Sequence, residues 1–502
     1  MYIYSHDKIS SNVLFRVTLP IADESDSGVK MTLEEFLQLV PLELGEYILP
    51  ATRVLLLRTV SKKIKDVVGR MQCRVDVEPG ANVRWVYADK SASYIQRRAA
   101  VNLFLGRSLQ MCVMDFPIRS FKIHGMCIDK TGSLNAMLRH SQRLEVLDMY
   151  NNHIPDNAIC EVFASIPASV RVLRLTRQWI NRSAVTPLCA TLARLEQLTE
   201  LDFSENYLNS QGMQGLMASI TSTQLSRISL RFNHLRSRFW DEYPRLGLDR
   251  FVLKELDLSH NLLQPVFGDN MYTCIQDSAS ILTKLDVSFN DLRLGGVSYL
   301  STALRHCYAL RHLSIAGNLC GDAAIALLLM VIRPYAPGAQ CIALESFDVG
   351  HNSLTCASAR LFHRSLYGCE ELHKSLSSVS FSNNDLNDTG AMLVIEALLP
   401  CDMKRLALAH CLMGETSGLC LAGTMLHWPM LADLDVDGNY LCNTSLILIA
   451  RALSENESEN KRMLFIRNSI MHASTEEIEE ILATPKGRKG VTSHTTPASA
   501  RA

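Results

Sequence analysis

The residues that come closest to a chemical site are Asp433, Asp435 and Asp437, which are spaced like the start of a calcium-binding loop. Such a loop needs a bidentate glutamate at its twelfth position to complete a set of oxygen ligands. The twelfth residue here is Thr444, so the ligand set is incomplete. The same aspartates also fit a repeating pattern of apolar and polar residues, and we therefore expect no metal at this segment.

Other catalytic patterns are missing from the sequence. It contains no glycine-rich phosphate loop, no zinc-protease helix and no nucleophile elbow. The 15 cysteines form no C-x-x-C pair, which favours free thiols in a reducing compartment. The sequence thus predicts no enzyme activity, no cofactor and no metal ion. Several cysteines stand where a helix needs an apolar residue: Cys160, Cys189, Cys307, Cys369 and Cys401.

The composition and the charge balance of the chain argue against some classes of binding partner. The 502 residues include 50 Lys plus Arg and 51 Asp plus Glu, so no net charge favours nucleic acid or membrane surfaces. The longest apolar run, Ile325–Ile332, is too short to cross a bilayer. The first residues lack the basic start and apolar centre of a signal peptide. We expect a cytoplasmic protein, with nuclear and axonemal locations left open.

One segment, residues 282–292, shows the pattern L-x-x-L-x-L-x-x-N-x-L that organises the chain. Alternation along a strand predicts that Lys284, Asp286 and Ser288 face solvent. Asn290 follows the strand, where its amide can both donate to and accept from turn backbone groups. A helix should then pack behind the strand. Four apolar side chains are expected to enter a core shared with neighbouring repeats: Leu282, Leu285, Val287 and Leu292.

The pattern recurs about every 28 residues, which is typical of a solenoid whose units stack to bury a continuous core. Clear units begin at Leu144, Val170, Leu198, Leu225, Leu253, Leu282, Leu310, Leu344, Leu376, Met403 and Leu431. Their asparagine positions hold Asn152, Gln178, Asn206, Asn233, Asn261, Asn290, Asn318, Asn352, Asn384, Cys411 and Asn439. A strand plus a full helix at this period resembles the ribonuclease inhibitor-like class of leucine-rich repeats. That resemblance implies an α/β horseshoe over residues 116–483, with parallel strands on its concave face.

A helical segment over residues 31–70 precedes the repeats and opens with a capping box at Thr32–Glu35. Its order of Val40-Pro41, Ile48-Leu49, Leu55-Leu56 and Val60-Ser61-Lys62 resembles an F-box, although Ile64 replaces the usual tryptophan. The resemblance implies that the segment docks the adaptor of a cullin-type ubiquitin ligase. The alternative is a plain helical cap over the first repeat. The adaptor-binding residues would be Pro41, Leu42, Leu44, Ile48, Leu55, Leu56 and Val60.

Three further segments flank or interrupt the array. We expect a flexible arm over residues 1–30, a connector with degenerate repeats over 71–115 and a disordered basic tail over 484–502. Pro244 argues against a regular helix in the irregular stretch 236–250, which is either a functional insertion or a loosely built repeat.

The concave face is the predicted site for a protein partner, because parallel strands there would present a long rigid surface. Its predicted contact residues are Glu200, Arg227, Arg231, Phe232, Glu255, Lys284, Phe289 and His312. A row of aspartates occupies one outward strand position, either as the ordinary consensus of such repeats or as an acidic stripe for a basic partner. The row comprises Asp148, Asp202, Asp257, Asp286, Asp348 and Asp435, interrupted by Arg174, Arg227, Arg231 and Arg405.

These patterns predict a non-enzymatic protein-binding protein, and the leading hypothesis is an F-box-like substrate receptor of a ubiquitin ligase. The alternative is a cytoskeletal or axonemal scaffold without a ubiquitin role. A regulator of a small GTPase is a third hypothesis, because the repeats also resemble those of the activating protein of the Ran GTPase. That family carries a strongly acidic tail, whereas Lys486, Arg488 and Lys489 make this tail basic.

Overall fold

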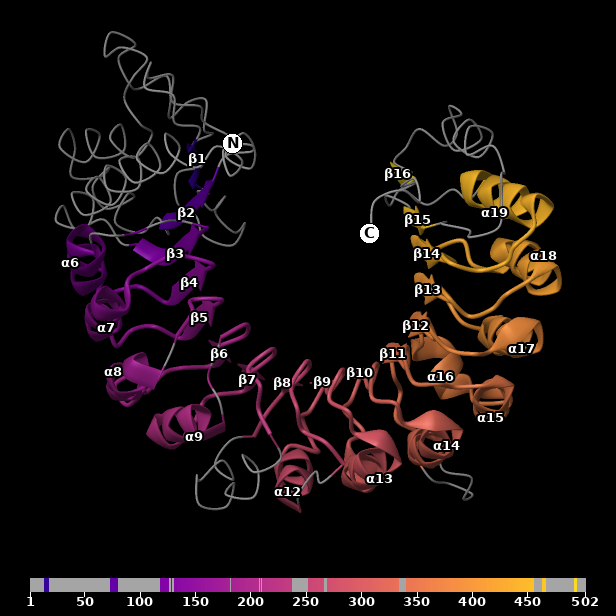
Figure 1. The fold of residues 1–502 in the computed structure, drawn as a ribbon, viewed down its shortest axis with the longest axis horizontal. Helices are drawn as coiled ribbons and strands as arrows, with labels where there is room; N and C mark the ends of the chain where they lie inside the picture. The colour runs from indigo at the N-terminus through magenta and orange to yellow at the C-terminus, as the bar shows by residue number, and fades with distance from the viewer. Residues whose placement is uncertain are drawn as a thin grey trace, which may run out of the picture. The chain divides into compact units, whose positions relative to one another are not determined.

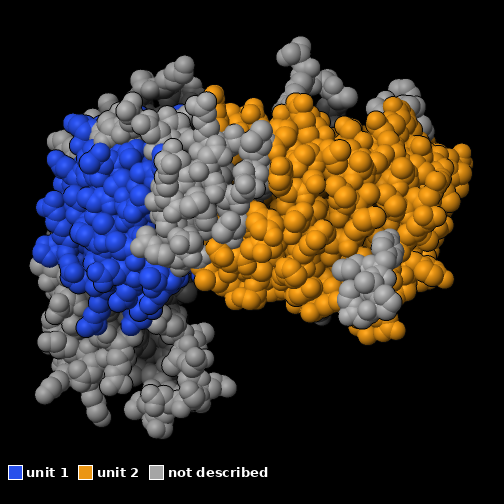
Figure 2. Space-filling model, turned by 90° about the horizontal axis from the view of Figure 1, so that it is seen from below, with its two compact units in different colours: residues 1–233 blue, residues 234–502 orange. Residues whose placement is uncertain are grey.

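The structure is a computed structural model in which the chain forms two compact units, residues 1–233 and 234–502 (Figure 2). It describes residues 13–17, 73–79, 118–125, 128, 131–180, 182–206, 208, 210–236, 252–265, 269–333, 340–455, 463–465 and 492–493. The predicted F-box-like segment and the irregular stretch 237–250 lie outside these ranges. Each unit is described by itself below.

Unit 1 is a sheet whose strands follow chain order, with helices on one side (Figure 1). Strand β1 lies within the segment expected to be a flexible arm and pairs antiparallel with β2, whereas the later strands pair in parallel. The elements are β1 (Val13–Val17), β2 (Cys73–Pro79), β3 (Ile118–His124), α6 (Gly132–His140), β4 (Val146–Tyr150), α7 (Asp156–Ser165), β5 (Val172–Thr176), α8 (Arg182–Leu192), β6 (Glu200–Asp202), α9 (Ser210–Ser219) and β7 (Arg227–Ser229).

Unit 2 repeats the same strand-then-helix order, with every described strand pair parallel and helices on one side of the sheet (Figure 1). Its first elements are β8 (Glu255–Asp257), α12 (Asp269–Asp277), β9 (Lys284–Asp286), α13 (Arg293–Ala303), η2 (Leu304–His306), β10 (His312–Ser314), α14 (Gly321–Ile332), β11 (Ser346–Asp348), α15 (Cys356–Leu366) and α16 (Glu370–Ser375). They are followed by β12 (Ser378–Ser380), α17 (Asn387–Leu398), β13 (Arg405–Ala407), α18 (Glu415–Thr424), η3 (Met425–His427), β14 (Asp433–Asp435), α19 (Asn443–Glu455), β15 (Met463–Phe465) and β16 (Thr492–Ser493), the last within the predicted disordered tail.

The core contains the apolar positions that the repeat pattern predicts. Leu285 of β9 lies opposite Leu313 of β10 in the strand register, and both side chains are buried. Lys284 is exposed as predicted, but Ser288 is only 6% exposed, which corrects the expectation that it faces solvent. Its hydroxyl turns back and donates a 2.6 Å hydrogen bond to Asp286 Oδ1. The strand alternation therefore ends at the turn.

Buried asparagines connect neighbouring repeats of unit 2, as the repeat pattern predicts, except where Cys411 takes the position. Asn318 is fully buried and its Nδ2 donates to the carbonyls of Val287 (3.0 Å) and Ile315 (2.8 Å). Its Oδ1 accepts from the backbone N–H groups of Asn290 (3.1 Å) and Leu292 (3.2 Å) in the preceding repeat. One amide thus satisfies turn groups of two repeats, where unpaired buried groups would cost about 1–3 kcal/mol each.

The preceding asparagine in this row, Asn290, donates hydrogen bonds from its side-chain amide but accepts none within the described residues. Asn290 Nδ2 donates to the carbonyls of Leu258 (2.9 Å), Val287 (3.0 Å) and Ser288 (3.1 Å). Its Oδ1 is buried and accepts no hydrogen bond from any residue in the part of the chain that the structure describes. The two neighbouring asparagines therefore differ in how tightly they couple repeats.

Two aspartates provide a second link, from the start of one helix to the start of the next. Asp388 at the beginning of α17 accepts from the backbone N–H groups of Gly414 (2.8 Å) and Ser417 (3.0 Å), which open α18. Asp322 of α14 accepts in the same way from the N–H of Thr355, the N-cap of α15. Burial would raise the pKa of both carboxyls, but the hydrogen bonds outweigh it and hold each pKa below its usual value.

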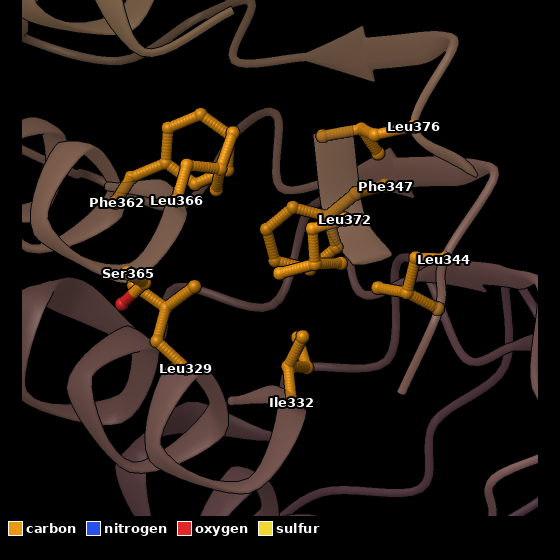
Figure 3. A pocket seen from close by; sticks show the side chains of 9 residues that line it. All are labelled: Leu329, Ile332, Leu344, Phe347, Phe362, Ser365, Leu366, Leu372 and Leu376. Atoms are coloured by element: carbon orange, nitrogen blue, oxygen red, sulfur yellow. The ribbon is translucent and has the colours of Figure 1, made fainter. Parts of the chain in front are cut away.

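One repeat of unit 2 is lengthened by the short helix α16, and a small hollow remains beside it (Figure 3). The hollow is lined by Leu329, Ile332, Leu344, Phe347, Phe362, Ser365, Leu366, Leu372 and Leu376. With Ser365 as the single polar residue in this lining, the hollow is a packing defect rather than a ligand site, because small apolar cavities stay dry.

We predict that replacing Asn318 with Ala lowers the free energy of unfolding more than the same change at Asn290. Asn290→Ala removes only donors and should cost about 1–3 kcal/mol. Asn318→Ala also leaves two buried N–H groups unpaired, so its cost should exceed that of Asn290→Ala by about 1 kcal/mol or more. Urea denaturation of the two variants measures the difference. Equal midpoints would show that acceptance by Oδ1 contributes nothing.

The aspartate link gives a pH-dependent prediction. Asp388→Ala should cost about 1 kcal/mol at neutral pH, as the loss of a helix N-cap does. Because the folded pKa lies below the unfolded one, this contribution is complete above about pH 4 and disappears as the pH falls further. Thermal melts from pH 7 to pH 2.5 should therefore show the wild-type and variant curves converging. The control is Asp385→Ala, which replaces an exposed residue in the turn before α17 and should have little effect on stability at any pH.

Candidate functional site

The candidate site is the strand face, defined here as the solvent-facing side chains of the strands and of the turns that follow them. All eight predicted contact residues lie on it and are at least partly exposed. Unit 1 holds Glu200 on β6, Arg227 on β7, and Arg231 and Phe232 in the next turn. Unit 2 holds Glu255 on β8, Lys284 on β9, Phe289 in the next turn and His312 on β10.

Most charges on the strand face of unit 1 pair with one another, whereas Asp202 accepts from the backbone N–H of Ser204. Arg174 donates from Nε to Glu200 at 2.7 Å and places Nη1 3.6 Å from Asp148. Arg227 lies 3.6 Å from Glu200, and Lys122 lies 3.5 Å from Asp148. Acidic and basic side chains thus alternate from β3 to β7 and largely neutralise each other.

Asp148 occupies the outward strand position beside Lys122 and Arg174, but it is only 8% exposed. Its neighbours cover it: His124 Nε2 lies 3.0 Å from its Oδ1, and Lys122 and Arg174 lie close by. Burial would raise the pKa of this carboxyl, but the hydrogen bond and charge of His124, together with Lys122 and Arg174, lower it below its usual value. Asp148 is therefore a structural anion that is not available to a partner.

The strand face of unit 2 has a different charge pattern. Asp286 accepts from the backbone N–H of Ser288 at 3.0 Å, and Asp348 accepts from that of Gly350 at 3.0 Å. Within the described residues neither carboxylate forms an ion pair. Burial raises the pKa of Asp286, and the charges of Asp257 and Asp348 raise it further. Each of these aspartates thus accepts a hydrogen bond within its own turn, as the repeat consensus requires. Within the described residues, Asp286 and Asp348 still have no compensating cation.

The residue before each repeat asparagine adopts a left-handed backbone conformation, which turns its side chain onto the strand face. Phe289 (φ 54°) stacks on His260 (φ 55°) with ring centres 4.3 Å apart, and His351 (φ 54°) lies 5.5 Å beyond. Gly317 occupies the same position between Phe289 and His351. A Cβ on Gly317 would come within 2.4 Å of the Phe289 ring, so the glycine makes room for the stack.

Sequence reasoning identified Phe289 but not its neighbours His260, His351 and Gly317. The repeat pattern could have identified them, because these three residues and Phe289 each immediately precede a repeat asparagine. What the sequence does not show is that this position is left-handed throughout, which brings residues about 30 apart into one row. The predicted adaptor-binding residues, from Pro41 to Val60, lie outside the described residues.

The strand face groups carboxylates, imidazoles and an exposed aromatic ring on short strands held by buried asparagines. Such a surface can bind cations and planar groups of another protein. Across the described residues, none of the helices has the length and apolar character needed to cross a membrane.

Comparisons with known proteins agree with this architecture. The family model described as Leucine Rich repeat matches residues 280–301. A ribonuclease inhibitor from Sus scrofa is 25% identical over 365 residues, covering 71% of this chain and 77% of that protein. NACHT, LRR and PYD domains-containing protein 14 from Homo sapiens is 25% identical over 366 residues, covering 71% of this chain but only 30% of that protein.

Among solved structures, a chain of the Rad7 and Elc1 complex in yeast aligns with 13% identity and a TM-score of 0.49, covering 82% of this chain and 94% of that one. The repeat pattern, the parallel sheet with helices on one side and the sequence relatives all agree. The chain therefore folds as a leucine-rich repeat solenoid and is similar to leucine-rich repeat proteins of the ribonuclease inhibitor-like type.

Proposed function

We propose that the protein is a non-enzymatic binding protein whose strand face holds another protein, and that unit 2 prefers a partner segment rich in basic residues. The observation that carries this proposal is the contrast between Asp148 in unit 1 and the pair Asp286 and Asp348 in unit 2. Asp148 in unit 1 is surrounded by cations, whereas Asp286 and Asp348 in unit 2 have no ion-pair partner among the described residues.

A basic partner would supply what the strand face of unit 2 lacks. Burial is the main cause of the raised pKa of Asp286, and the charges of Asp257 and Asp348 add to it. A guanidinium between Asp286 and Asp348 would offset that repulsion. Arginine would suit this face better than lysine, because its planar group can also stack on Phe289 and the flanking imidazoles of His260 and His351. A row of like charges would also increase the rate at which a basic partner associates.

The strand face of unit 1 offers less to a basic partner. Glu200 is already paired with Arg174 and Arg227, so a new cation would have to displace them. Arg231 already lies over the ring of Phe232 at 5.0 Å. We therefore assign the larger share of basic-partner affinity to unit 2.

We predict that the double variant Asp286→Asn, Asp348→Asn weakens binding of basic partners by about tenfold or more, because it removes two charges with little change of shape. Full-length wild type and variant, immobilised in parallel, would be compared for the proteins that each retains, quantified by mass spectrometry. Glu396→Gln, which removes an exposed carboxylate on the helix side, is the matched control. If the control released the same proteins, or the double variant released none, the assignment to the strand face would fail.

We further propose that residues 40–68 dock the adaptor of a cullin-type ubiquitin ligase, which would make the chain a substrate receptor. This proposal is supported by the sequence alone, through the order Val40-Pro41, Leu55-Leu56 and Val60-Ser61. The scaffold hypothesis gives the same residues a capping role, since the open end of a repeat array needs a cover.

The two roles differ in what the full-length protein carries from cells. We predict that wild type copurifies with an adaptor and a cullin, and that Leu55→Glu, Leu56→Glu loses both while still retaining strand-face partners. Asp286→Asn, Asp348→Asn is the reciprocal control and should keep the adaptor. Wild type that never carries an adaptor or cullin would favour the scaffold hypothesis and refute the receptor role.

A further inference from the structure

Two cysteines and a glutamate meet at the edge of the lengthened repeat in unit 2, away from the strand face. Cys341 lies on the stretch that leads into β11, Cys369 directly precedes α16, and Glu371 lies in the first turn of α16. The Sγ atoms of Cys341 and Cys369 are 3.6 Å apart, and Cys369 Sγ lies 3.7 Å from Glu371 Oε2. All three potential ligand atoms lie within 4.8 Å of one another.

These distances are those of a metal site. Two thiolates bound to Zn²⁺ at about 2.3 Å in a tetrahedral arrangement lie about 3.8 Å apart, and a thiolate and a carboxylate oxygen about 3.5 Å apart. A disulfide would instead require the sulfurs to approach to about 2.05 Å. The arrangement of Cys341, Cys369 and Glu371 thus needs only small adjustments to accept an ion between the three atoms.

The chemistry of the three side chains selects the kind of ion. Two thiolates prefer a soft or borderline cation such as Zn²⁺, whereas Ca²⁺ and Mg²⁺ require oxygen ligands. Three protein ligands leave the fourth tetrahedral position open to water. Burial, Cys369 and Glu371 raise the pKa of the Cys341 thiol to about 11, so the metal must displace its proton. Two thiolates and one carboxylate would exceed the dication by one negative charge, and the nearby cation of Arg333 opposes that charge.

An ion could reach the three side chains from solvent, and the neighbouring Arg333 is held in a fixed position. Cys369 is buried, Cys341 is half-buried and Glu371 is exposed, so an ion can enter from the solvent side and reach a shielded thiolate. Arg333 is held in place because its Nη1 donates to the carbonyls of Ser365 and Tyr367, each at 2.6 Å.

We propose that Cys341, Cys369 and Glu371 form a Zn²⁺ site that fastens the start of α16 to the stretch preceding β11. Binding would replace the two thiol protons with two sulfur–metal bonds, and both protons would leave to solvent, with no change of oxidation state. The bound ion would join two segments 28 residues apart and stabilise the folded repeat.

Cobalt titration of the full-length protein under reducing conditions tests the site, because Co²⁺ bound to thiolates absorbs strongly in the near ultraviolet. We expect one equivalent of Co²⁺ to give this band, Zn²⁺ to displace it, and Zn²⁺ to raise the melting temperature. Cys341→Ser should abolish both effects. Glu371→Gln should weaken metal binding by about an order of magnitude or more, while Cys420→Ser, another half-buried thiol, should leave it unchanged.

Three results would overturn the proposal. They are the absence of a thiolate band at millimolar Co²⁺, a band that persists in Cys341→Ser, and a Cys341–Cys369 disulfide in protein taken directly from cells. A circular dichroism melt of Cys341→Ser establishes that the variant folds. Cys341→Ala serves as a second variant with no remaining ligand atom at that position.

Discussion

The structure depends on how a buried amide satisfies the turns of two repeats at once. Asn318 donates to carbonyls in its own and the preceding repeat and accepts two N–H groups from that preceding repeat. No apolar residue can replace both functions, and a charged one would be buried without a partner. This requirement fixes where the asparagine follows the strand, because each amide must meet the turn of its neighbour even across a repeat of 34 residues.

The same constraint shapes the surface. The residue before the asparagine is held in a left-handed conformation, which is costly for a residue with a side chain and persists only because the surrounding contacts fix it. Phe289 and His260 are brought together in this way, one per repeat. The Asp286 carboxylate is fixed in the same turn by Ser288. Stability inside the turn and chemistry on the strand face thus come from neighbouring residues of one motif.

The repeat register made much of the fold predictable, including the buried asparagines and the direction of Lys284. It misjudged Ser288 and did not indicate that Asp148 is covered, because alternation describes a strand and not the turn or the cations of the next repeat. The contact of Cys341 with Cys369 was not predictable, since it depends on how the lengthened repeat folds back before α16. Charge compensation in unit 1 also required coordinates, because it joins residues such as Arg174 and Glu200 that lie 26 positions apart.

The central claim is that the Asp286 carboxylate of unit 2 has no compensating cation within the described residues, whereas the Asp148 carboxylate of unit 1 is surrounded by cations. Carbon-13 NMR of the aspartate carboxyls, titrated from pH 2.5 to pH 7 and assigned with Asp148→Asn and Asp286→Asn, tests it directly. We expect Asp148 to have a pKa below the ordinary aspartate value and Asp286 to have one above it. Equal pKa values for the two carboxyls, or the reverse order, would contradict the account.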